Sequence, residues 1–236
     1  MKAKQDWIER AKKNAALEAV KHVRDCSVVG LGSGSTAAYA IEAIGERIRR
    51  DGLNILGVPT SYQAFALAVK HGIAVTTLEE YPTLDLTIDG VDQVDEKLNL
   101  IKGMGGALTR EKIVASASKQ NIVVADRNKR VKVLGEKGHP LPIEVLPFAL
   151  AVVKRSIERL GGKPVLREGK GKVGPVVTDN GNMIVDAVFG PIDDPGALEG
   201  RLKLVPGVLE TGLFVGLVDL VYLGTASGVE KIERKR

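Results

Sequence analysis

The sequence predicts an α/β protein in two parts, a mainly parallel sheet with helices on both faces and a smaller α+β domain. Two observations lead to this prediction. Between residues 27 and 125, apolar strand segments alternate with amphipathic helices, which indicates βαβ units and parallel strands. After residue 140 the order becomes β-α-β-β-α-β, which is typical of a ferredoxin-like, split βαβ domain. We therefore expect a Rossmann-like sheet joined to a ferredoxin-like domain.

The chain of 236 residues is long enough to bury a core in each part. We expect residues 1-134 together with 208-236 to form the larger α/β domain, because the apolar segment 217–224 is typical of a strand that returns to the first sheet. Residues 135-207 are expected to form the small α+β domain.

The first part of the chain is predicted to form a helix, a buried strand and a glycine-rich turn. An apolar stripe at helical spacing predicts a helix over residues 3–24. The continuous apolar run at 27–31 is typical of a parallel strand buried on both faces. The turn Gly32-Ser33-Gly34-Ser35-Thr36 follows and opens a second helix over residues 37–49.

This glycine-rich turn favours a single phosphate over a dinucleotide. A dinucleotide fingerprint needs a third glycine where Ser35 stands and an acid after the second strand, where the chain has Pro59-Thr60-Ser61. The turn also lacks the Gly-Lys-Ser/Thr ending of a P-loop. Glycines allow the backbone to approach a phosphate, Ser35 and Thr36 add hydroxyls, and a helix N-terminus attracts negative charge.

The remaining elements follow from turn residues and apolar runs. In the first part we expect a helix capped by Ser61 and closed by Gly72, and a helix over residues 107–118. In the second part we expect a helix with Pro147 in its first turn and another that begins at Asp194-Pro195. The predicted strands are 53–58, 73–77, 84–89, 121–125, 141–145, 164–167, 176–178, 183–188 and 208–215.

Two acids stand at the end of the predicted strand 84–89 and just beyond it. Asp89-Gly90-Val91-Asp92 lies where ligands bind in open α/β sheets, past the carboxyl end of a strand. A solvated loop would explain any one of these residues by itself. Their combination with the next segment is what indicates a site.

The next segment places a lysine, a run of residues rich in glycine and a third acid around the start of a helix. Lys102 precedes Gly103-Met104-Gly105-Gly106, and Glu111 falls in the first turn of the helix that follows. Free N–H groups and the helix dipole favour negative charge at this position. Few structural purposes need these groups so close together, so we interpret the whole stretch as a ligand site.

The charge and composition of the chain indicate which class of ligand it binds. The net charge of +5 and the isoelectric point near 9.2 suit an anion, either a phosphorylated metabolite or nucleic acid. Aromatic residues make up only 4% of the chain and the lysines are dispersed, which argues against nucleic acid. The three histidines lie far apart and none stands at a metal-ligand spacing, so we expect no metal.

Membrane and redox features point to the cytoplasm. No apolar run reaches the about 20 residues that a membrane span requires, so we expect no membrane association. The N-terminal segment is charged throughout, so we expect no secretory signal. The single Cys26 excludes an internal disulfide, which indicates a reducing compartment, and we expect Cys26 to be a small core residue.

Several of these motifs carry a resemblance to a known family. DGVD at 89–92 and NLIKGMGGALTREKIVA at 99–115 resemble the signature segment of the type A ribose-5-phosphate isomerases. GLGSGST resembles that family's GxGTGST, and PLPIEV, TDNGNMIVD and PGVLETGLF resemble its later motifs. The resemblance extends from Ser27 to about Gly228, with Val91 in place of an alanine and Met104 in place of a glycine.

The residues and the resemblance together predict an aldose–ketose isomerase. It would interconvert ribose 5-phosphate and ribulose 5-phosphate through a cis-enediolate, in the non-oxidative pentose phosphate pathway. We expect Glu111 to act as the base and Lys102, with the backbone amides 103–106, to stabilise the oxyanion. We expect Asp89 and Asp92 to hold sugar hydroxyls and help to open the furanose ring.

The resemblance also implies how the substrate is bound. Lys129 follows the strand 121–125 at the position of the family's phosphate-binding lysine, although it could equally be an exposed loop lysine. The resemblance further implies no metal or organic cofactor, and a homodimer or homotetramer. The residues expected to contact the sugar phosphate are Ser33, Gly34, Ser35, Thr36, Asp89, Gly90, Val91, Asp92, Lys102, Gly103, Met104, Gly105 and Lys129.

Two other classes remain open at this point. A non-catalytic sugar-phosphate sensor could use a similar fold, but it would not need both Lys102 and Glu111. Such sensors carry a DNA-binding module, for which the single helix before residue 27 is too short. A different sugar-phosphate enzyme on a related fold, such as a deaminase or a CoA transferase, is the second alternative.

Overall fold

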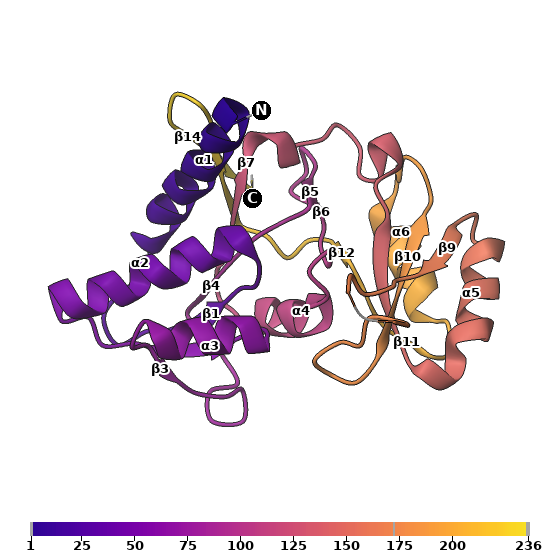
Figure 1. Cartoon of the computed structure of the whole chain (residues 1–236), viewed down its shortest axis with the longest axis horizontal. Coiled ribbons are helices and arrows are strands. Elements are labelled where there is room, and N and C mark those ends of the chain that lie inside the picture. Colours follow the sequence, from indigo (N-terminus) through magenta and orange to yellow (C-terminus); the bar gives the residue numbers. More distant parts are fainter. Residues whose placement is uncertain (1, 172, 235–236) are drawn as a thin grey trace. The chain divides into compact units, whose positions relative to one another are not determined.

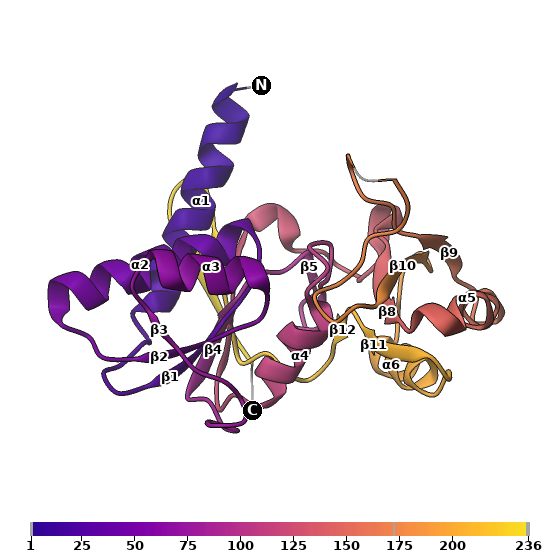
Figure 2. The ribbon, with the colours of Figure 1, turned by 60° about the horizontal axis from the view of Figure 1, so that its bottom comes forward.

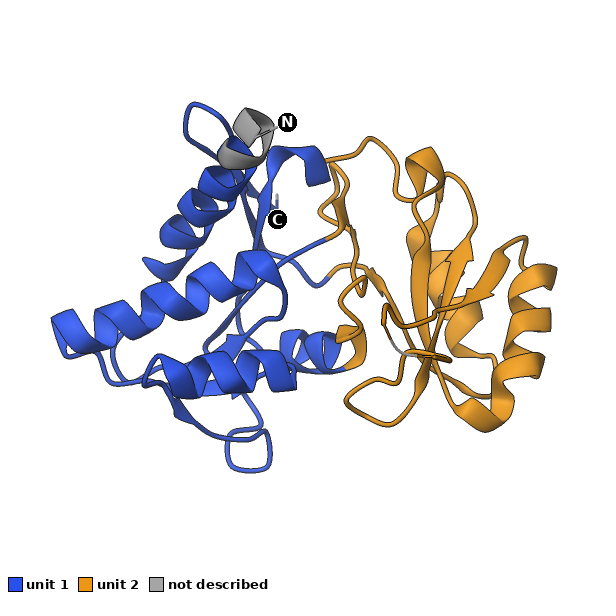
Figure 3. Ribbon diagram, viewed as in Figure 1, with its two compact units in different colours: residues 1–91, 110–129, 217–236 blue, residues 92–109, 130–216 orange. Residues whose placement is uncertain are grey.

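The computed structural model describes residues 2–171 and 173–234, which fold into two compact units (Figures 1 and 3). Unit 1 comprises residues 1–91, 110–129 and 217–236, and unit 2 comprises residues 92–109 and 130–216. Within the described residues, no helix is long and apolar enough to cross a membrane.

These units divide the chain differently from the two domains that we expected. Residues 92–109, 130–134 and 208–216 belong to unit 2 rather than to the larger domain. Backbone pairing explains the difference, because β6 (Leu100–Ile101) pairs with both β5 (Gln93–Val94) and β12 (Leu213–Phe214). These strands form a separate three-stranded sheet.

Unit 1 is built on the expected parallel sheet. Its seven strands lie in the order β14-β13-β7-β4-β1-β2-β3, and only the β13–β14 pair is antiparallel. The central strands are buried along their whole length, as continuous apolar runs predict. The strands are β1 (Val28–Leu31), β2 (Leu56–Pro59), β3 (Ala74–Val75), β4 (Leu86–Asp89), β7 (Asn121–Asp126), β13 (Leu220–Gly224) and β14 (Val229–Glu233).

Helices cover both faces of this sheet. The helices α1 (Lys2–Val20), α2 (Ser35–Asp51) and α3 (Tyr62–Lys70) lie on one face (Figure 2). Their apolar side chains pack on alternate residues of the strands. On the other face, α4 (Leu108–Ser116) places Val114 against residues of β1 and β2. Gly30 makes this approach possible, because a Cβ there would lie 2.6 Å from Val114.

The end of the first helix differs from the prediction, and so does Cys26. The helix ends at Val20, and residues 21–23 form a turn instead of continuing to residue 24. The prediction that Cys26 is a core residue is wrong: it is exposed, with φ at 59°, and β1 begins only at Val28. Its neighbour Asp25 fixes this turn by accepting a hydrogen bond from the Asn54 amide at 2.7 Å.

Unit 2 contains the predicted ferredoxin-like order. Its four-stranded sheet has the order β11-β8-β10-β9, with every neighbouring pair antiparallel. The elements in chain order are the 3-10 helix η2 (Glu136–Gly138), β8 (Leu141–Val145), the 3-10 helix η3 (Pro147–Ala149), α5 (Leu150–Arg159), β9 (Lys163–Leu166), β10 (Met183–Val188), α6 (Pro195–Lys203) and β11 (Val208–Thr211).

Two strands of this unit differ from the sequence prediction. The strand expected at 208–215 is divided at Gly212, so that β11 pairs with β8 and β12 pairs with β6. The strand expected at 176–178 is reduced to an isolated bridge between Val177 and Met183. The Thr178 hydroxyl donates instead to the buried carboxylate of Glu144, at 2.8 Å.

Candidate active site

The carboxyl edge of the unit 1 sheet gathers most of the predicted substrate ligands. Strands β1, β4 and β7 are parallel neighbours, so their final residues reach the same edge. The chain leaves β1 toward β2 on one side and later returns to β4 on the other, which makes this a topological switch point. The predicted residues that follow these strands are Ser33, Gly34, Ser35, Thr36, Asp89, Gly90, Val91 and Lys129.

Asp89 ties together the loops that follow β1 and β4. The residue is 6% exposed, and its Oδ1 accepts hydrogen bonds from the Ser33 amide at 3.1 Å and the Gly90 amide at 2.7 Å. Gly32 is required beside it, because a Cβ at this position would lie 2.2 Å from Asp89 Oδ1. The first glycine of the predicted phosphate turn therefore makes room for the first acid.

The Ser33 hydroxyl points toward the loop that follows β2. Its Oγ lies 2.8 Å from Thr60 Oγ1 and 2.6 Å from Ser61 Oγ. Sequence reasoning predicted Ser33 as a ligand and missed Thr60 and Ser61 as its partners. No local pattern indicates this contact, because the residues meet only when β1 and β2 pair.

The start of α2 carries a cation that sequence reasoning also missed. Lys12, on α1, donates from Nζ to Ser35 Oγ at 3.2 Å and to Glu9 Oε1 at 2.8 Å. The hydrogen bond from Lys12 lowers the pKa of Glu9, so this carboxylate stays ionised and partly balances the ammonium. Gly34 precedes the helix with φ at 96°, a backbone conformation that favours glycine.

The end of β7 supplies the other predicted phosphate ligand. Lys129 lies in the 3-10 helix η1 (Arg127–Lys129) and is half-buried. The loop is fixed by Asp126, which is 3% exposed and accepts a hydrogen bond from the Asn128 amide at 3.1 Å.

In unit 2, Lys102 is a buried lysine at the end of β6. It is 4% exposed, and its Nζ lies 5.6 Å from the centroid of the Phe214 ring, a distance at which the ring face attracts a cation. Its backbone is fixed too, since the Lys102 amide donates to the Gly212 carbonyl at 2.8 Å. Gly212, which divides β11 from β12, has no room for a side chain, because a Cβ would lie 2.2 Å from that lysine's carbonyl oxygen.

The glycine loop after Lys102 uses two of its own amides internally. The Met104 amide donates to Asp92 Oδ2 at 3.0 Å, and the Gly106 amide donates to the Gly103 carbonyl at 3.0 Å. The expected set of oxyanion donors is therefore reduced, and the amides of Gly103 and Gly105 remain as candidates. Asp92 gains a defined orientation from the same contact.

Glu111 lies in the first turn of α4 and is 5% exposed. The helix is held at its start by Thr109, whose hydroxyl donates to Glu144 Oε2 at 2.6 Å. At the next residue, the Arg110 guanidinium lies 5.4 Å from the Tyr62 ring centroid. These contacts fix the helix that carries the predicted base.

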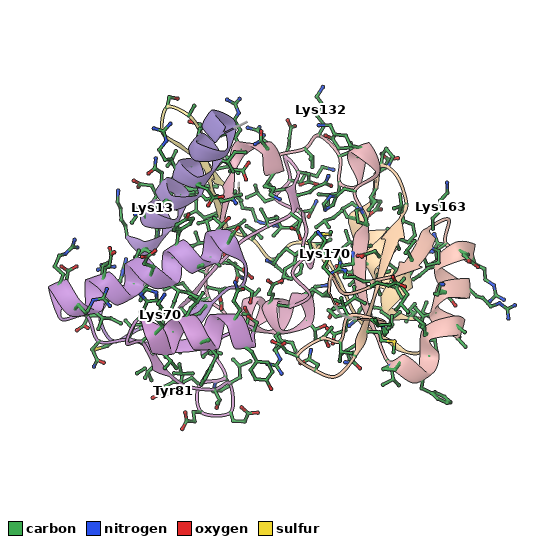
Figure 4. All side chains as sticks on the ribbon, viewed as in Figure 1. Lys13, Lys70, Tyr81, Lys132, Lys163 and Lys170 are labelled. Carbon is green, nitrogen blue, oxygen red and sulfur yellow. The ribbon has the colours of Figure 1, made fainter. Side chains whose placement is uncertain are left out.

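The positive charge of the chain is spread over many elements. Exposed lysines include Lys13 and Lys70 on unit 1, and Lys132, Lys163 and Lys170 on unit 2 (Figure 4). This agrees with the dispersed lysines of the sequence.

Comparison with known proteins identifies the family. The family model of ribose 5-phosphate isomerase A (phosphoriboisomerase A) matches residues 56–228. Ribose-5-phosphate isomerase A of Methanothermobacter thermautotrophicus is 52% identical over 219 residues, which cover 93% of this chain and 96% of that protein. The corresponding protein of Pyrococcus horikoshii is 47% identical over 228 residues, covering 96% of this chain and 99% of that protein.

Solved structures agree with the sequence comparisons. Ribose 5-phosphate isomerase A from Methanocaldococcus jannaschii is 47% identical, with a TM-score of 0.92 over 95% of this chain and 99% of that chain. A D-ribose-5-phosphate isomerase in complex with phospho-erythronic acid is 47% identical, with a TM-score of 0.94 over 96% of this chain and 99% of that chain. The resemblance in the motifs is thus confirmed along almost the whole sequence, and this chain belongs to the ribose 5-phosphate isomerase A family.

Proposed function

We propose that this chain interconverts ribose 5-phosphate and ribulose 5-phosphate, an aldose–ketose isomerisation of the non-oxidative pentose phosphate pathway. The observation that carries the proposal is the buried carboxylate of Glu111, at the start of the helix that follows the buried Lys102 and its glycine loop. Family membership supports the substrate pair, because relatives that match nearly the whole chain are ribose-5-phosphate isomerases.

In this proposal Glu111 moves the proton between C2 and C1. The carboxylate removes the C2 proton of the open-chain aldose, the C–H electron pair forms the C1–C2 double bond, and the carbonyl π pair moves onto O1. The same carboxylate then returns a proton to C1, while O2 becomes the ketone and its proton passes to O1. General-base catalysis of this kind contributes about 10²–10⁴ in rate.

Lys102 and two backbone amides would stabilise the cis-enediolate. The Lys102 ammonium and the amides of Gly103 and Gly105 would donate to O1 as negative charge develops there. Fixed donors of this kind act without reorganisation during the reaction, which makes them a large part of many enzymes' rate enhancement. No step of this mechanism assigns charge stabilisation to a metal.

The two acids of the DGVD motif would hold sugar hydroxyls and assist ring opening. Backbone amides orient the carboxylates of both Asp89 and Asp92. Carboxylates held in a fixed direction would then accept hydrogen bonds from the sugar hydroxyls. Gly90, Val91 and the backbone of Met104 would contact the sugar alongside them.

The phosphate would be bound at the carboxyl edge of the unit 1 sheet. Ser35, Thr36 and the N-terminus of α2 would supply hydroxyls, amides and the helix dipole, with Lys129 as a cation. Lys12 adds a second cation to the set that we expected, because it already donates to Ser35. These groups would bind ground and transition states alike, so they would set KM more than kcat.

We further propose that the chain assembles as a homodimer or homotetramer and acts in the cytoplasm. The single cysteine of the chain supports a reducing compartment. The dispersed lysines and the low aromatic content support a small anionic substrate rather than nucleic acid.

The direct test is to incubate the purified protein with ribose 5-phosphate, with and without prior chelation, and to measure ketose formation. We expect turnover in both samples. Binding of the sugar phosphate without turnover would instead favour a sensor, and activity that is lost on chelation and restored by one divalent ion would overturn the metal-free mechanism.

The enediolate has its own test. Substrate deuterated at C2 should give ketose with part of the deuterium at C1 and the rest exchanged into water, because a carboxylate at a loop-lined site can exchange before it returns the proton. Complete retention under every condition would indicate a hydride shift, and complete loss would indicate two bases in contact with water.

A further inference from the structure

Arg167 lies just after β9, outside every motif that indicated the site, yet it holds the glycine loop. We propose that Arg167, itself held by Asp186 of β10, is a positioning residue that fixes the direction of the backbone amides following Gly103 and Met104. The inference rests on the proposed function, because one of these two amides, that of Gly105, is a donor that we assign to the oxyanion.

The guanidinium connects a carboxylate to two consecutive carbonyl groups. Its Nη1 donates to the Gly103 carbonyl at 2.8 Å and to the Met104 carbonyl at 3.1 Å. On its other side, Nε and Nη2 donate to the two oxygens of Asp186 at 2.8 and 2.5 Å. All four residues belong to unit 2, and the arrangement is therefore local to one compact unit.

The guanidinium is suited to this position by its shape and its burial. The Arg167 side chain is 12% exposed and the Asp186 side chain 20% exposed, so the pair is little screened by water. The rigid guanidinium fork pairs with both carboxylate oxygens and still directs Nη1 at the loop. A lysine ammonium is a single point of charge and could not keep both geometries.

Because the peptide bond is planar, fixing the direction of a carbonyl group also fixes the direction of the next residue's N–H group. In a trans peptide the carbonyl of one residue and the N–H of the next point in opposite directions, and the peptide bonds of this loop are trans. Holding the Gly103 carbonyl therefore directs the Met104 amide away from Arg167, and that amide donates to Asp92 Oδ2. Holding the Met104 carbonyl likewise directs the Gly105 amide, which we assign to the oxyanion.

The Met104 side chain completes the arrangement. Its Sδ lies 3.9 Å from Arg167 Nη2, while the residue as a whole is 43% exposed. The residue that departs from the family's glycine thus lies against the arginine that orders its own backbone.

The test compares Arg167→Ala with the parent protein by kcat, KM and melting temperature. We expect kcat to fall about 10- to 100-fold, since loss of a whole oxyanion donor costs about 10²–10³ and here the Gly105 amide stays but loses its direction. We expect KM to stay within about threefold, because the phosphate ligands lie elsewhere. Guanidinium ion in the assay should restore part of kcat, and sodium chloride at the same ionic strength should not.

Lys203→Met is a matched control in the same unit. Lys203 also joins a carboxylate to a backbone carbonyl, with Nζ 2.9 Å from Glu210 Oε2 and 2.7 Å from the Leu209 carbonyl oxygen. It should change kcat less than twofold. Equal losses in the two variants, or an Arg167→Ala loss without guanidinium rescue, would overturn the proposal.

Two further measurements test the role of Arg167 if Arg167→Ala does not fold or if the parent protein shows no turnover. If Arg167→Ala does not fold, Arg167→Lys is assayed in the same way, and a kcat within twofold of the parent would overturn the proposal. Binding of phospho-erythronic acid, whose carboxylate resembles the two enediolate oxygens, should weaken at least tenfold in the variant. This binding measurement does not need turnover, so it tests Arg167 even if the parent protein forms no ketose.

Discussion

At the scale of single residues, Glu111 is the group on which the proposed chemistry depends. We predict that Glu111→Gln lowers kcat by about 10²–10⁴, because the amide keeps the shape of the side chain but cannot accept the proton. KM should change little, since the phosphate ligands are untouched. The measurement is steady-state ketose formation. A variant that keeps a tenth or more of the parent's kcat would show that another group is the base.

Met104 is the residue at which the chain departs from the glycine loop of its family. We predict that Met104→Gly leaves kcat within a few-fold of the parent but lowers the melting temperature. The reason is that glycine adds backbone entropy to the unfolded chain and removes the sulfur that lies against Arg167. Kinetics and thermal denaturation of the same preparation would show this. A large change in kcat or in sugar preference would place the methionine side chain against the substrate.

At the scale of elements, Glu144 joins two motifs whose purpose the sequence did not show. This carboxylate of β8 is fully buried and accepts hydrogen bonds from Thr109 and from three residues of the turn 178–182. The TDNGN motif therefore supplies uncharged donors for the glutamate of the PLPIEV motif. The start of α4 is attached to the same carboxylate.

We predict that Glu144→Gln lowers the free energy of unfolding by about 1–3 kcal/mol, because the new NH₂ group faces donors and leaves buried polar groups unsatisfied. Urea denaturation would measure the loss, with Glu158→Gln on the exposed face of α5 as the control. A Glu144→Gln protein as stable as that control would show that the network contributes nothing to stability.

The turn that follows α1 contains His22, whose titration is expected to make the stability of the fold depend on pH. His22 Nε2 lies 2.8 Å from the Tyr222 hydroxyl of β13. Burial lowers the pKa of His22, and the nearby charges of Lys231 and Arg24 act in the same direction. In the window between the ordinary pKa of about 6.5 and the lowered value, the unfolded chain binds more protons, so stability falls as pH falls.

We therefore predict that His22→Gln removes part of this pH dependence. Glutamine can keep a hydrogen bond to Tyr222 without titrating. Free energies of unfolding measured by urea denaturation above and below pH 6.5 should differ less for the variant than for the parent. An unchanged difference would mean that other groups cause the whole effect.

Elements differed in how well the sequence predicted them, for physical reasons. The strands Leu141–Val145 and Met183–Val188 were predicted to the residue, because proline or turn residues stand beside a short apolar run in each case. The division of 208–215 into two strands was missed, because it depends on β6, which is distant in the sequence. Contacts of this kind leave no local pattern.

The same reason governs what was predicted of the candidate site. Residues of short motifs, such as Asp89 and Lys102, could be proposed from spacing and resemblance alone. Lys12, Thr60 and Arg167 could not, because each meets its partner only through the folding of separate segments.

At the scale of the whole molecule, large apolar side chains remain exposed on unit 2. Phe148 is 97% exposed and Leu204 is 83% exposed, which is typical of surfaces that contact another protein. We predict that the chain of 25.2 kDa has a solution mass of two or four chains, as light scattering coupled to gel filtration would measure. A mass of one chain at micromolar concentration would contradict the proposed assembly.

The pairing of β6 with β12 determines when the site can form during synthesis. Lys102 and the glycine loop emerge from the ribosome well before Leu213–Phe214, the strand with which β6 pairs. The strand β13, which lies beside β7 in the unit 1 sheet, emerges later still. A nascent chain that stops before Gly212 therefore contains every residue we assign to catalysis but lacks the strand and the aromatic ring beside Lys102. The enzyme is thus expected to acquire activity only when β12 and β13 have been translated, so termination before them would yield an inactive protein rather than a weakened one.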